Sequence, residues 1–359
     1  MVSRSGKLKV KWVLLLLCSV SVIVYVVFLS RRPILEAHKS ESTEEIKHQH
    51  HPIIIHGSKY GSQILLQLPE NISHVQGIMF VAHACTHSAY DFWPPSPHCA
   101  ACIGLAEEVA IVQASVSKEF AVIAMSSLDR QSGCWGDGDI AGVVSAVQAV
   151  QKEYALEHIP VFALGCSSGG RFVWKLAQIS NLFNGIVVQS MSLDIMRASS
   201  RAQLRQVPVV FNPMSRDSHT LRQVRSNMDM LVSSGYHIGD IVFQECQPLP
   251  VTSSYLVKRL WFLHITFQEA DLVISALEEA GHLSRDTGML LKDPTNTNNN
   301  WRAVLIEHLP VDLMSRLVLT RGKSPLAKVL HRAWAFHEYC ADYVVDSIEF
   351  LMSKVTGRS

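Results

Sequence analysis

A serine between glycines is the residue of this 359-residue sequence whose setting best suits chemistry. Ser167 lies in Gly165-Cys-Ser-Ser-Gly169, directly after the apolar run 160–164 and before a segment, 171–178, that is typical of a helix. In such a strand–turn–helix the serine hydroxyl projects from the edge of a sheet, and the glycines let strand and helix pack closely. The five-residue pattern is loose and arises by chance, so a nucleophile at Ser167 requires partners elsewhere.

A serine hydroxyl becomes a nucleophile when a base takes its proton, and the base needs an acid that fixes its tautomer. When the serine follows a strand of a mostly parallel sheet, the usual chain order is serine, acid, histidine. Asp217 follows the expected strand 207–211, and His337 precedes the last expected helix, so these two are the predicted acid and base. The alternatives are Asp194 as acid and His331 or His282 as base, whereas His219 is too near Asp217 in sequence to be its partner.

Attack on a carbonyl group creates an oxyanion, which two backbone N–H groups must stabilise. The residue after the nucleophile, Ser168, supplies the first donor. The second is expected from the loop after the earlier strand 77–82, where the N–H of Cys85 is the favoured donor and that of Ala84 the alternative. A small residue at position 84 lets this loop pass close to Ser167.

Four further residues are expected beside the site if the strands follow this order. They are His83, Phe92, Trp93 and Trp135, which we assign to a substrate pocket. Packing beneath a loop is the alternative for the aromatic residues. The chemistry requires neither a metal ion nor an organic cofactor.

Apolar runs alternate with helix-like segments from residue 60 onward, which predicts an α/β fold with a mostly parallel sheet flanked by helices. The loops that follow successive parallel strands then gather at one edge of the sheet. The expected strands are 62–68, 77–82, 120–125, 160–164, 185–190, 207–211 and 238–246, and the further expected helices are 105–116, 139–157 and 341–355.

The region 248–330 interrupts this alternation. It holds helix-like stretches at 254–264, 269–280 and 301–307, with an asparagine-rich turn before the last of them. We predict a helical cap or subdomain inserted into an α/β domain that spans 57–359. An independent module is the alternative.

The N-terminus carries a candidate membrane span. Residues 12–30 are uncharged, and 19 residues are long enough to cross a bilayer as a helix. More basic residues precede this run than follow it, which favours a cytosolic tail (1–11), a type II signal anchor and a lumenal domain in the ER or Golgi. A long cleaved signal and an organellar presequence are the alternatives. A polar, histidine-containing stalk is predicted over 31–56.

The cysteines suit an oxidising lumen, because seven of the eight lie outside the predicted span. Cys99 and Cys102 form a single C-x-x-C, which is too little for a zinc site and suggests a local disulfide or a longer one to Cys134. Cys85 and Cys166 are expected to be small buried residues.

Composition narrows the classes of partner. A formal net charge of +1 with 18% charged residues gives no reason to expect nucleic acid as a partner. Asn71-Ile-Ser73 is an N-glycosylation sequon that would face the lumen. A small acyl or ester substrate and the membrane are the expected partners.

Several segments resemble the α/β-hydrolase superfamily of serine hydrolases, and within it a poorly characterised eukaryotic branch best represented in plants and algae. The resemblance covers about 58 to 359 and rests on 83–93, 126–130 with Cys134-Trp135, 165–170 and His337-Glu338. It implies a serine nucleophile at 167, an acid at 217, a base at 337 and acyl chemistry on esters. One departure is Ala84, where the superfamily usually has glycine, so a Cβ is added at the oxyanion loop.

The expected function is therefore that of a membrane-anchored serine hydrolase, with a carboxylic ester as substrate and an acyl-enzyme intermediate. Acyl transfer to an alcohol would use the same residues. A non-catalytic receptor or scaffold that retains the fold is the alternative from another class. A redox function of Cys99-x-x-Cys102 is disfavoured, because no thioredoxin-like pattern surrounds this motif.

Overall fold

The computed structural model describes residues 51–56, 62–195 and 204–357. The predicted tail, the predicted span and most of the predicted stalk lie outside these ranges. Within them, no helix combines the length and the apolar character that a membrane crossing requires.

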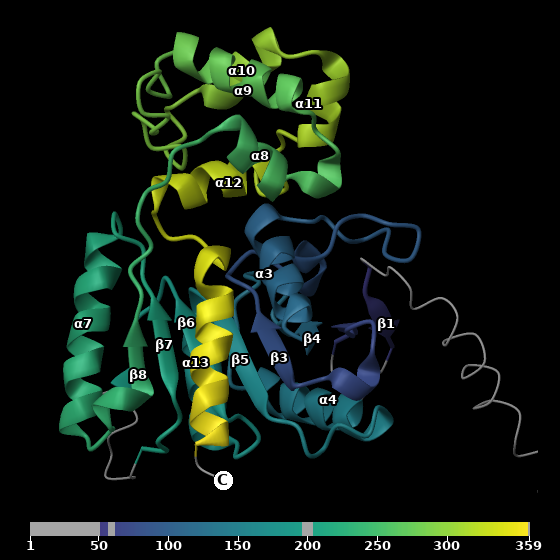
Figure 1. Cartoon of the computed structure of the whole chain (residues 1–359), viewed down its shortest axis with the longest axis vertical. Coiled ribbons are helices and arrows are strands. Elements are labelled where there is room, and N and C mark those ends of the chain that lie inside the picture. The colour runs from purple at the N-terminus through teal and green to yellow at the C-terminus, as the bar shows by residue number, and fades with distance from the viewer. Residues whose placement is uncertain (1–50, 57–61, 196–203, 358–359) are drawn as a thin grey trace, which may run out of the picture. The chain divides into compact units, whose positions relative to one another are not determined.

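Eight strands form one sheet in the order β1-β2-β4-β3-β5-β6-β7-β8 (Figure 1). β2 runs antiparallel to both of its neighbours, and every other neighbouring pair is parallel. The predicted α/β fold with a mostly parallel sheet is thereby confirmed. The strands are β1 (Ile53–Ile55), β2 (Ile64–Gln67), β3 (Gly77–Ala82), β4 (Phe120–Met125), β5 (Val161–Cys166), β6 (Gly185–Gln189), β7 (Val209–Asn212) and β8 (Ile241–Phe243).

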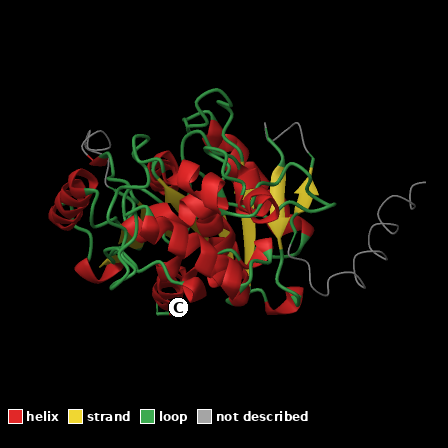
Figure 2. Ribbon diagram, turned by 90° about the horizontal axis from the view of Figure 1, so that it is seen from above, coloured by secondary structure: helices red, strands yellow, loops and turns green. Residues whose placement is uncertain are grey.

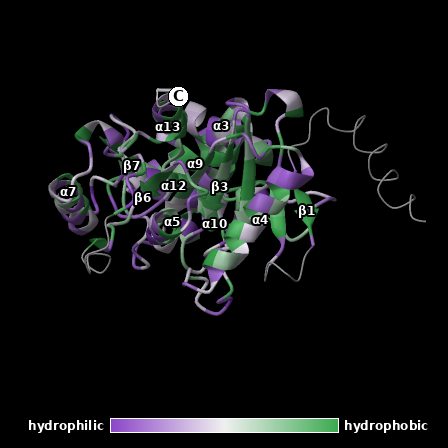
Figure 3. Ribbon diagram, turned by 90° about the horizontal axis from the view of Figure 1, so that it is seen from below, coloured by the Kyte–Doolittle hydropathy of each residue, from purple (hydrophilic) through white to green (hydrophobic). Residues whose placement is uncertain are grey.

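Helices cover both faces of the sheet, which is why the central strands are continuous buried runs (Figures 1 and 2). α3 and α13 share one hydrophobic core with one set of strand side chains, and α4, α5 and α7 share another with the opposite set. Hydrophobic colour accordingly gathers along the sheet in Figure 3. These helices are α3 (Ala106–Ser117), α4 (Asp139–Glu153), α5 (Ser168–Ile179), α7 (Ser218–Ser233) and α13 (Val344–Thr356).

A group of helices lies between β8 and α13 in sequence and stands together at one end of the sheet in Figure 1. It has a hydrophobic core of its own, which Ala106 of α3 joins. Two adjacent glutamates of α3 also face cations of this region: Glu107 lies 3.6 Å from Arg259, and Glu108 lies 3.9 Å from Lys328. The helices are α8 (Ser253–Arg259), α9 (Phe267–Glu279), α10 (Trp301–His308), α11 (Val311–Leu317) and α12 (Pro325–Trp334).

Some predicted boundaries are wrong. Ile53–Ile55, which we assigned to the stalk, forms the edge strand β1 and pairs with β2. The helix predicted to end at 157 ends at Glu153, because the chain turns at Ala155 with a φ of 57°. The last strand has only three residues, since a 3₁₀ turn occupies 238–240. The inserted helices continue to Trp334, four residues beyond the predicted limit.

Candidate active site

Ser167 occupies a single-residue turn between β5 and α5. Its φ of 54° and ψ of −120° are unfavourable for a residue with a Cβ, so the surrounding structure must hold this conformation in place. The Ser167 N–H donates to the carbonyl of Gln189 at 3.1 Å, which anchors the turn to the end of β6. Burial raises the pKa of the neighbouring Cys166 thiol well above its ordinary value, so that thiol is a poor nucleophile.

Two glycines allow strand and helix to meet this closely. A Cβ on Gly165 would lie 2.3 Å from the carbonyl carbon of Gly169. A Cβ on Gly169 would lie 2.1 Å from the carbonyl oxygen of Ala82, the last residue of β3. No side chain fits at either position, because non-bonded carbon and oxygen atoms require more than about 3 Å.

The turn lies where the order of strands reverses. β3 pairs with β4 on one side and β5 on the other, so the connections after β3 and β5 leave in opposite directions. Crevices at the carboxyl ends of such strands are the usual ligand sites of open α/β sheets. Ser167 and the loop after Ala82 both lie at this point.

Ser167, His337 and Asp217 form one chain of hydrogen bonds. The Nε2 of His337 lies 3.0 Å from the Oγ of Ser167, and its Nδ1 lies 2.9 Å from the Oδ2 of Asp217. Asp217 also caps α7, where its Oδ1 accepts from the N–H of Thr220 at 3.1 Å. Burial opposes ionisation of Asp217, but the hydrogen bonds from His337 and Thr220 outweigh it and lower the pKa of this carboxyl.

The loop that carries His337 has no regular structure, and buried polar groups hold it in place. The side-chain amide of Gln189 accepts from the N–H of Cys340 and donates to its carbonyl, both at 2.9 Å. The hydroxyl of Ser190 donates to the carbonyl of Glu338 at 2.7 Å, and that of Tyr339 donates to Ala82 at 2.7 Å. These residues were not predicted from the sequence. The feature that could have indicated them is a polar Gln-Ser pair at the end of a buried apolar strand.

The alternative histidines lie elsewhere. His331 on α12 approaches the carboxylate of Glu338 at 3.4 Å, His282 is buried in the inserted region, and His219 is exposed on α7. Asp194, the alternative acid, lies in the loop after β6. Of these candidates, His337 is the histidine that contacts Ser167, and Asp217 is the carboxylate that contacts His337.

The loop after β3 lies against the start of α5, because Gly169 touches the carbonyls of Ala82 and His83. The N–H groups of Ala84, Cys85 and Ser168, the predicted oxyanion donors, therefore belong to the same edge. Their role in binding an oxyanion stays a prediction.

A disulfide links Cys85 to Cys134 in the loop after β4. This corrects our expectation that Cys85 is a plain buried residue and that Cys134 pairs, if at all, with the C-x-x-C. Cys99 and Cys102 form the local disulfide. Cys166 is buried and unoxidised, as expected.

The side chain of His83 is fully buried and bonds to the backbone through both ring nitrogens, and its predicted place in a substrate pocket stays a prediction. Its Nδ1–H donates to the carbonyl of Ala84 at 2.8 Å, and its Nε2 accepts from the N–H of Ser127 at 3.0 Å. Trp135 is half-buried and donates to the His83 carbonyl at 2.8 Å. Burial outweighs the carbonyl of Ala84 and lowers the pKa of His83 to about 4.

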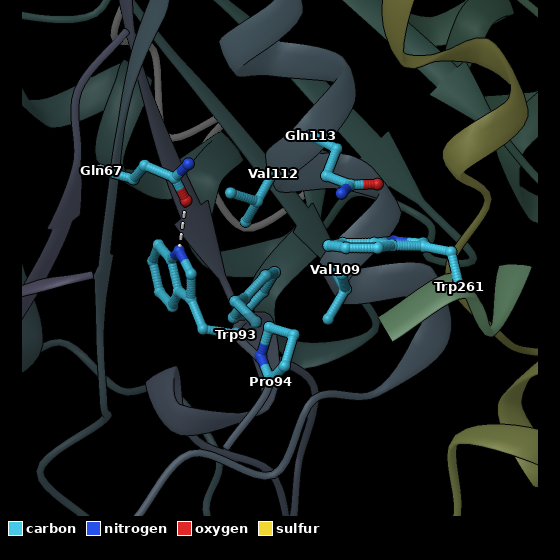
Figure 4. A pocket seen from close by; sticks show the side chains of 8 residues that line it. Gln67, Trp93, Pro94, Val109, Val112, Gln113 and Trp261 are labelled. Atoms are coloured by element: carbon cyan, nitrogen blue, oxygen red, sulfur yellow. Dashed lines mark hydrogen bonds between the residues drawn. The ribbon is translucent and has the colours of Figure 1, made fainter. Parts of the chain in front are cut away.

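Phe92 and Trp93 are also fully buried, and whether they contact a substrate stays a prediction. Their loop folds down against α3, and Trp93 donates from Nε1 to Gln67 of β2 at 2.7 Å (Figure 4). A small pocket lies there and contains none of the hydrogen-bonded trio. Its lining residues are Gln67, Phe92, Trp93, Pro94, Val109, Val112, Gln113 and Trp261.

Comparison with known proteins finds similarity only at low sequence identity. No family profile matches the sequence, and no curated protein matches it. Similar solved structures are a thermostable esterase (15% identity, 55% of this chain and 54% of that one, TM-score 0.39), an alpha-beta serine hydrolase homologue from Coxiella burnetii (12%, 55% and 88%, 0.37) and the Bacillus cereus carboxylesterase (12%, 58% and 94%, 0.38). Because these sequence identities and TM-scores are low, an inference of activity must rest on the geometry of the site.

The contact at Gly169 predicts a sharp effect of a single methyl group. Gly169→Ala should lower the free energy of unfolding by at least about 3 kcal/mol, because the Cβ meets backbone oxygens that cannot move away independently. Gly138→Ala is the matched control, since its Cβ would meet only Leu128 at 3.8 Å, and it should change stability by less than about 1 kcal/mol. Urea unfolding measures both, and equal stabilities would contradict the assigned packing.

The pKa of His83 predicts a loss of stability in acid. The unfolded chain protonates this histidine below about pH 6.5, but the folded protein does so only below about pH 4. Between these values the unfolded state binds more protons, so the free energy of unfolding decreases as the pH is lowered, by about 3 kcal/mol in total. Urea titrations at several pH values should give a flatter profile for His83→Gln and an unchanged one for His158→Gln at an exposed site. Proton uptake by native His83 near pH 6.5, followed by NMR, would refute this.

Proposed function

We propose that this protein is a serine hydrolase of the α/β-hydrolase superfamily that cleaves carboxylic esters through an acyl-enzyme. The observation that carries the proposal is the hydrogen-bond chain from Ser167 through His337 to Asp217 at the end of β5. It unites a nucleophile, a base and an acid contributed by distant parts of the sequence, at the edge of the sheet where α/β proteins usually bind ligands.

The geometry indicates the role of each group. Asp217 remains a carboxylate because its pKa is lowered, and it accepts the Nδ1–H of His337. That tautomer leaves the lone pair of Nε2 facing the hydroxyl of Ser167 at 3.0 Å. His337 removes the hydroxyl proton as Ser167 attacks the ester carbonyl, and then returns the proton to the departing alcohol. Water, activated by the same histidine, releases the acid.

Charge on the carbonyl oxygen develops beside the start of α5. We assign its stabilisation to the N–H of Ser168 and the N–H of Cys85, with that of Ala84 as the alternative second donor. The disulfide from Cys85 to Cys134 restricts the motion of the donor loop. Donors held in place in this way need no reorganisation when the charge forms.

A fluorophosphonate probe and a panel of short-chain aryl esters test the proposal. Wild-type protein should be labelled and should hydrolyse an ester, and Ser167→Ala should lose both properties. His337→Ala should reduce kcat by about 10⁴-fold, because the serine then lacks its base. His219→Ala, at an exposed position on α7, is the matched control and should keep full activity.

Folding of each variant is checked by circular dichroism. Well-folded wild-type protein that the probe does not label would refute the hydrolase proposal and favour a receptor or scaffold. Serine-dependent labelling with acyl transfer to an added alcohol, and no release of free acid, would instead indicate a transferase.

We also propose that residues 12–30 anchor the domain to an endomembrane as a type II signal anchor, with the domain in the lumen. The 19-residue uncharged run and the two disulfides support this topology. Asn71 of the sequon is exposed, as glycosylation requires.

Carbonate extraction of cells that express the full chain tests the anchor. The protein should stay with the membranes, and a chain without residues 12–30 should not. Glycosidase treatment should increase the mobility of the wild type but not of Asn71→Gln. Release of the full chain by carbonate would contradict the anchor, and an unglycosylated Asn71 would count against the lumenal domain.

A further inference from the structure

A second set of ionisable side chains lies behind the loop that carries His337. Lys328 of α12 and Glu338, the residue after His337, are its centre, with side chains only 12% and 5% exposed. Glu108 of α3, His87 from the loop after β3 and His331 of α12, whose Nδ1 lies 3.4 Å from Glu338, complete the group. The hydrolase mechanism proposed above uses none of these five side chains.

Lys328 makes contacts in three directions. Its ammonium group donates to both carboxylate oxygens of Glu338, at 3.0 and 2.9 Å, and to the Nε2 of His87 at 3.3 Å. It lies 3.9 Å from Glu108. His87 in turn donates from Nδ1 to Asp91 at 2.6 Å, so the network reaches back into the loop after β3.

The side chains of this group differ in their tendency to be ionised. Burial opposes a charge on Glu338, but Lys328 outweighs it and holds the pKa of this carboxyl well below its usual range. Burial likewise opposes the ammonium, and Glu338 and Glu108 outweigh it and raise the pKa of Lys328. Burial dominates at Glu108, whose raised pKa favours the neutral acid. Lys328 and Glu338 thus form the ion pair of the network.

Glu338 links Lys328 to the backbone that directly follows His337. Its Oε1 accepts from the N–H of Tyr339 at 3.0 Å, and its own carbonyl accepts from Ser190. His337 has a φ of 43°, a strained value for a residue with a Cβ, and its side chain is 40% exposed. The solvent side therefore gives this ring little support, and its position depends on the backbone that Glu338 fixes.

We propose that Lys328 is a positioning residue for His337, and that it acts through its two hydrogen bonds to Glu338. This inference rests on the proposed function of His337 as the base. Because Lys328 belongs to the last inserted helix, the same contact ties the inserted region to the reacting histidine. The competing account is that Lys328 only neutralises a buried carboxylate.

Three variants separate positioning from neutralisation. Lys328→Met removes the ammonium from Glu338 and leaves His331 as the neighbouring ring beside this carboxylate, whereas Lys328→Met with Glu338→Gln removes both charges of the pair. Lys323→Met, at an exposed position before α12, is the matched control. For each variant we would measure the melting temperature, kcat and KM for an aryl ester, and the rate of fluorophosphonate labelling per folded molecule.

Positioning predicts that Lys328→Met lowers kcat and the labelling rate by about 10- to 100-fold, with KM changed less than about threefold. The double variant should regain melting temperature and still turn over slowly, because the amide then at position 338 lacks a bidentate partner. Recovery of kcat together with stability would overturn the proposal, as would wild-type kcat in folded Lys328→Met. If Lys328→Met does not fold, the double variant decides, because it carries neither charge of the pair and lacks the two hydrogen bonds: a full wild-type kcat would overturn the proposal.

The wild type distinguishes this failure from that of the hydrolase proposal. Absence of serine-dependent labelling in wild-type protein would refute the proposed function itself. Labelling of the wild type and of Lys328→Met at equal rates would refute only the positioning role.

Discussion

The close contact between α5 and the end of β3 is the constraint on which the site depends. Gly169 lies so near the carbonyls of Ala82 and His83 that no Cβ fits between them. This contact fixes the start of α5 against the loop after β3, and with it the strained turn at Ser167. Ser167, the proposed nucleophile, and the predicted oxyanion donors consequently share one edge of the sheet. Strain at Ser167 persists because packing on both sides leaves the chain no alternative.

The histidine reaches this edge by a different route. Its loop belongs to no helix or strand, so its backbone groups need partners from elsewhere. The polar residues that end β6, Gln189 and Ser190, supply several of them, and Tyr339 bonds to the last carbonyl of β3. The ends of two strands therefore act as a template for a segment that lies far along the chain. Such bonds are strong in a dry interior, where an unpaired group would be costly.

Local patterns predicted what depends on neighbours in sequence. The strand before Gly165 and the helix after Ser167 could be predicted because strand, turn and helix are contiguous in the sequence. The usual chain order then pointed to Asp217 and His337. Contacts that depend on how the loops fold against the rest of the domain could not be predicted from the sequence. Trp93 was expected beside Ser167, but its loop turns against α3, where Trp93 is buried and lines a small pocket that does not include Ser167. The pairing of Cys85 with Cys134 likewise arises only once two loops meet.

The adjacent glutamates of α3 show why the packing of the inserted helices against α3 could not be predicted from the sequence. Neighbouring helical residues point about 100° apart, so Glu107 and Glu108 cannot both face the sheet. Both are buried because the inserted helices cover the remaining side of α3 and bring Arg259 and Lys328 to meet them. A buried carboxylate is tolerable only with such partners or as the neutral acid. Two charges in an apolar helix therefore indicate a covering element with cations, although its identity depends on the tertiary fold.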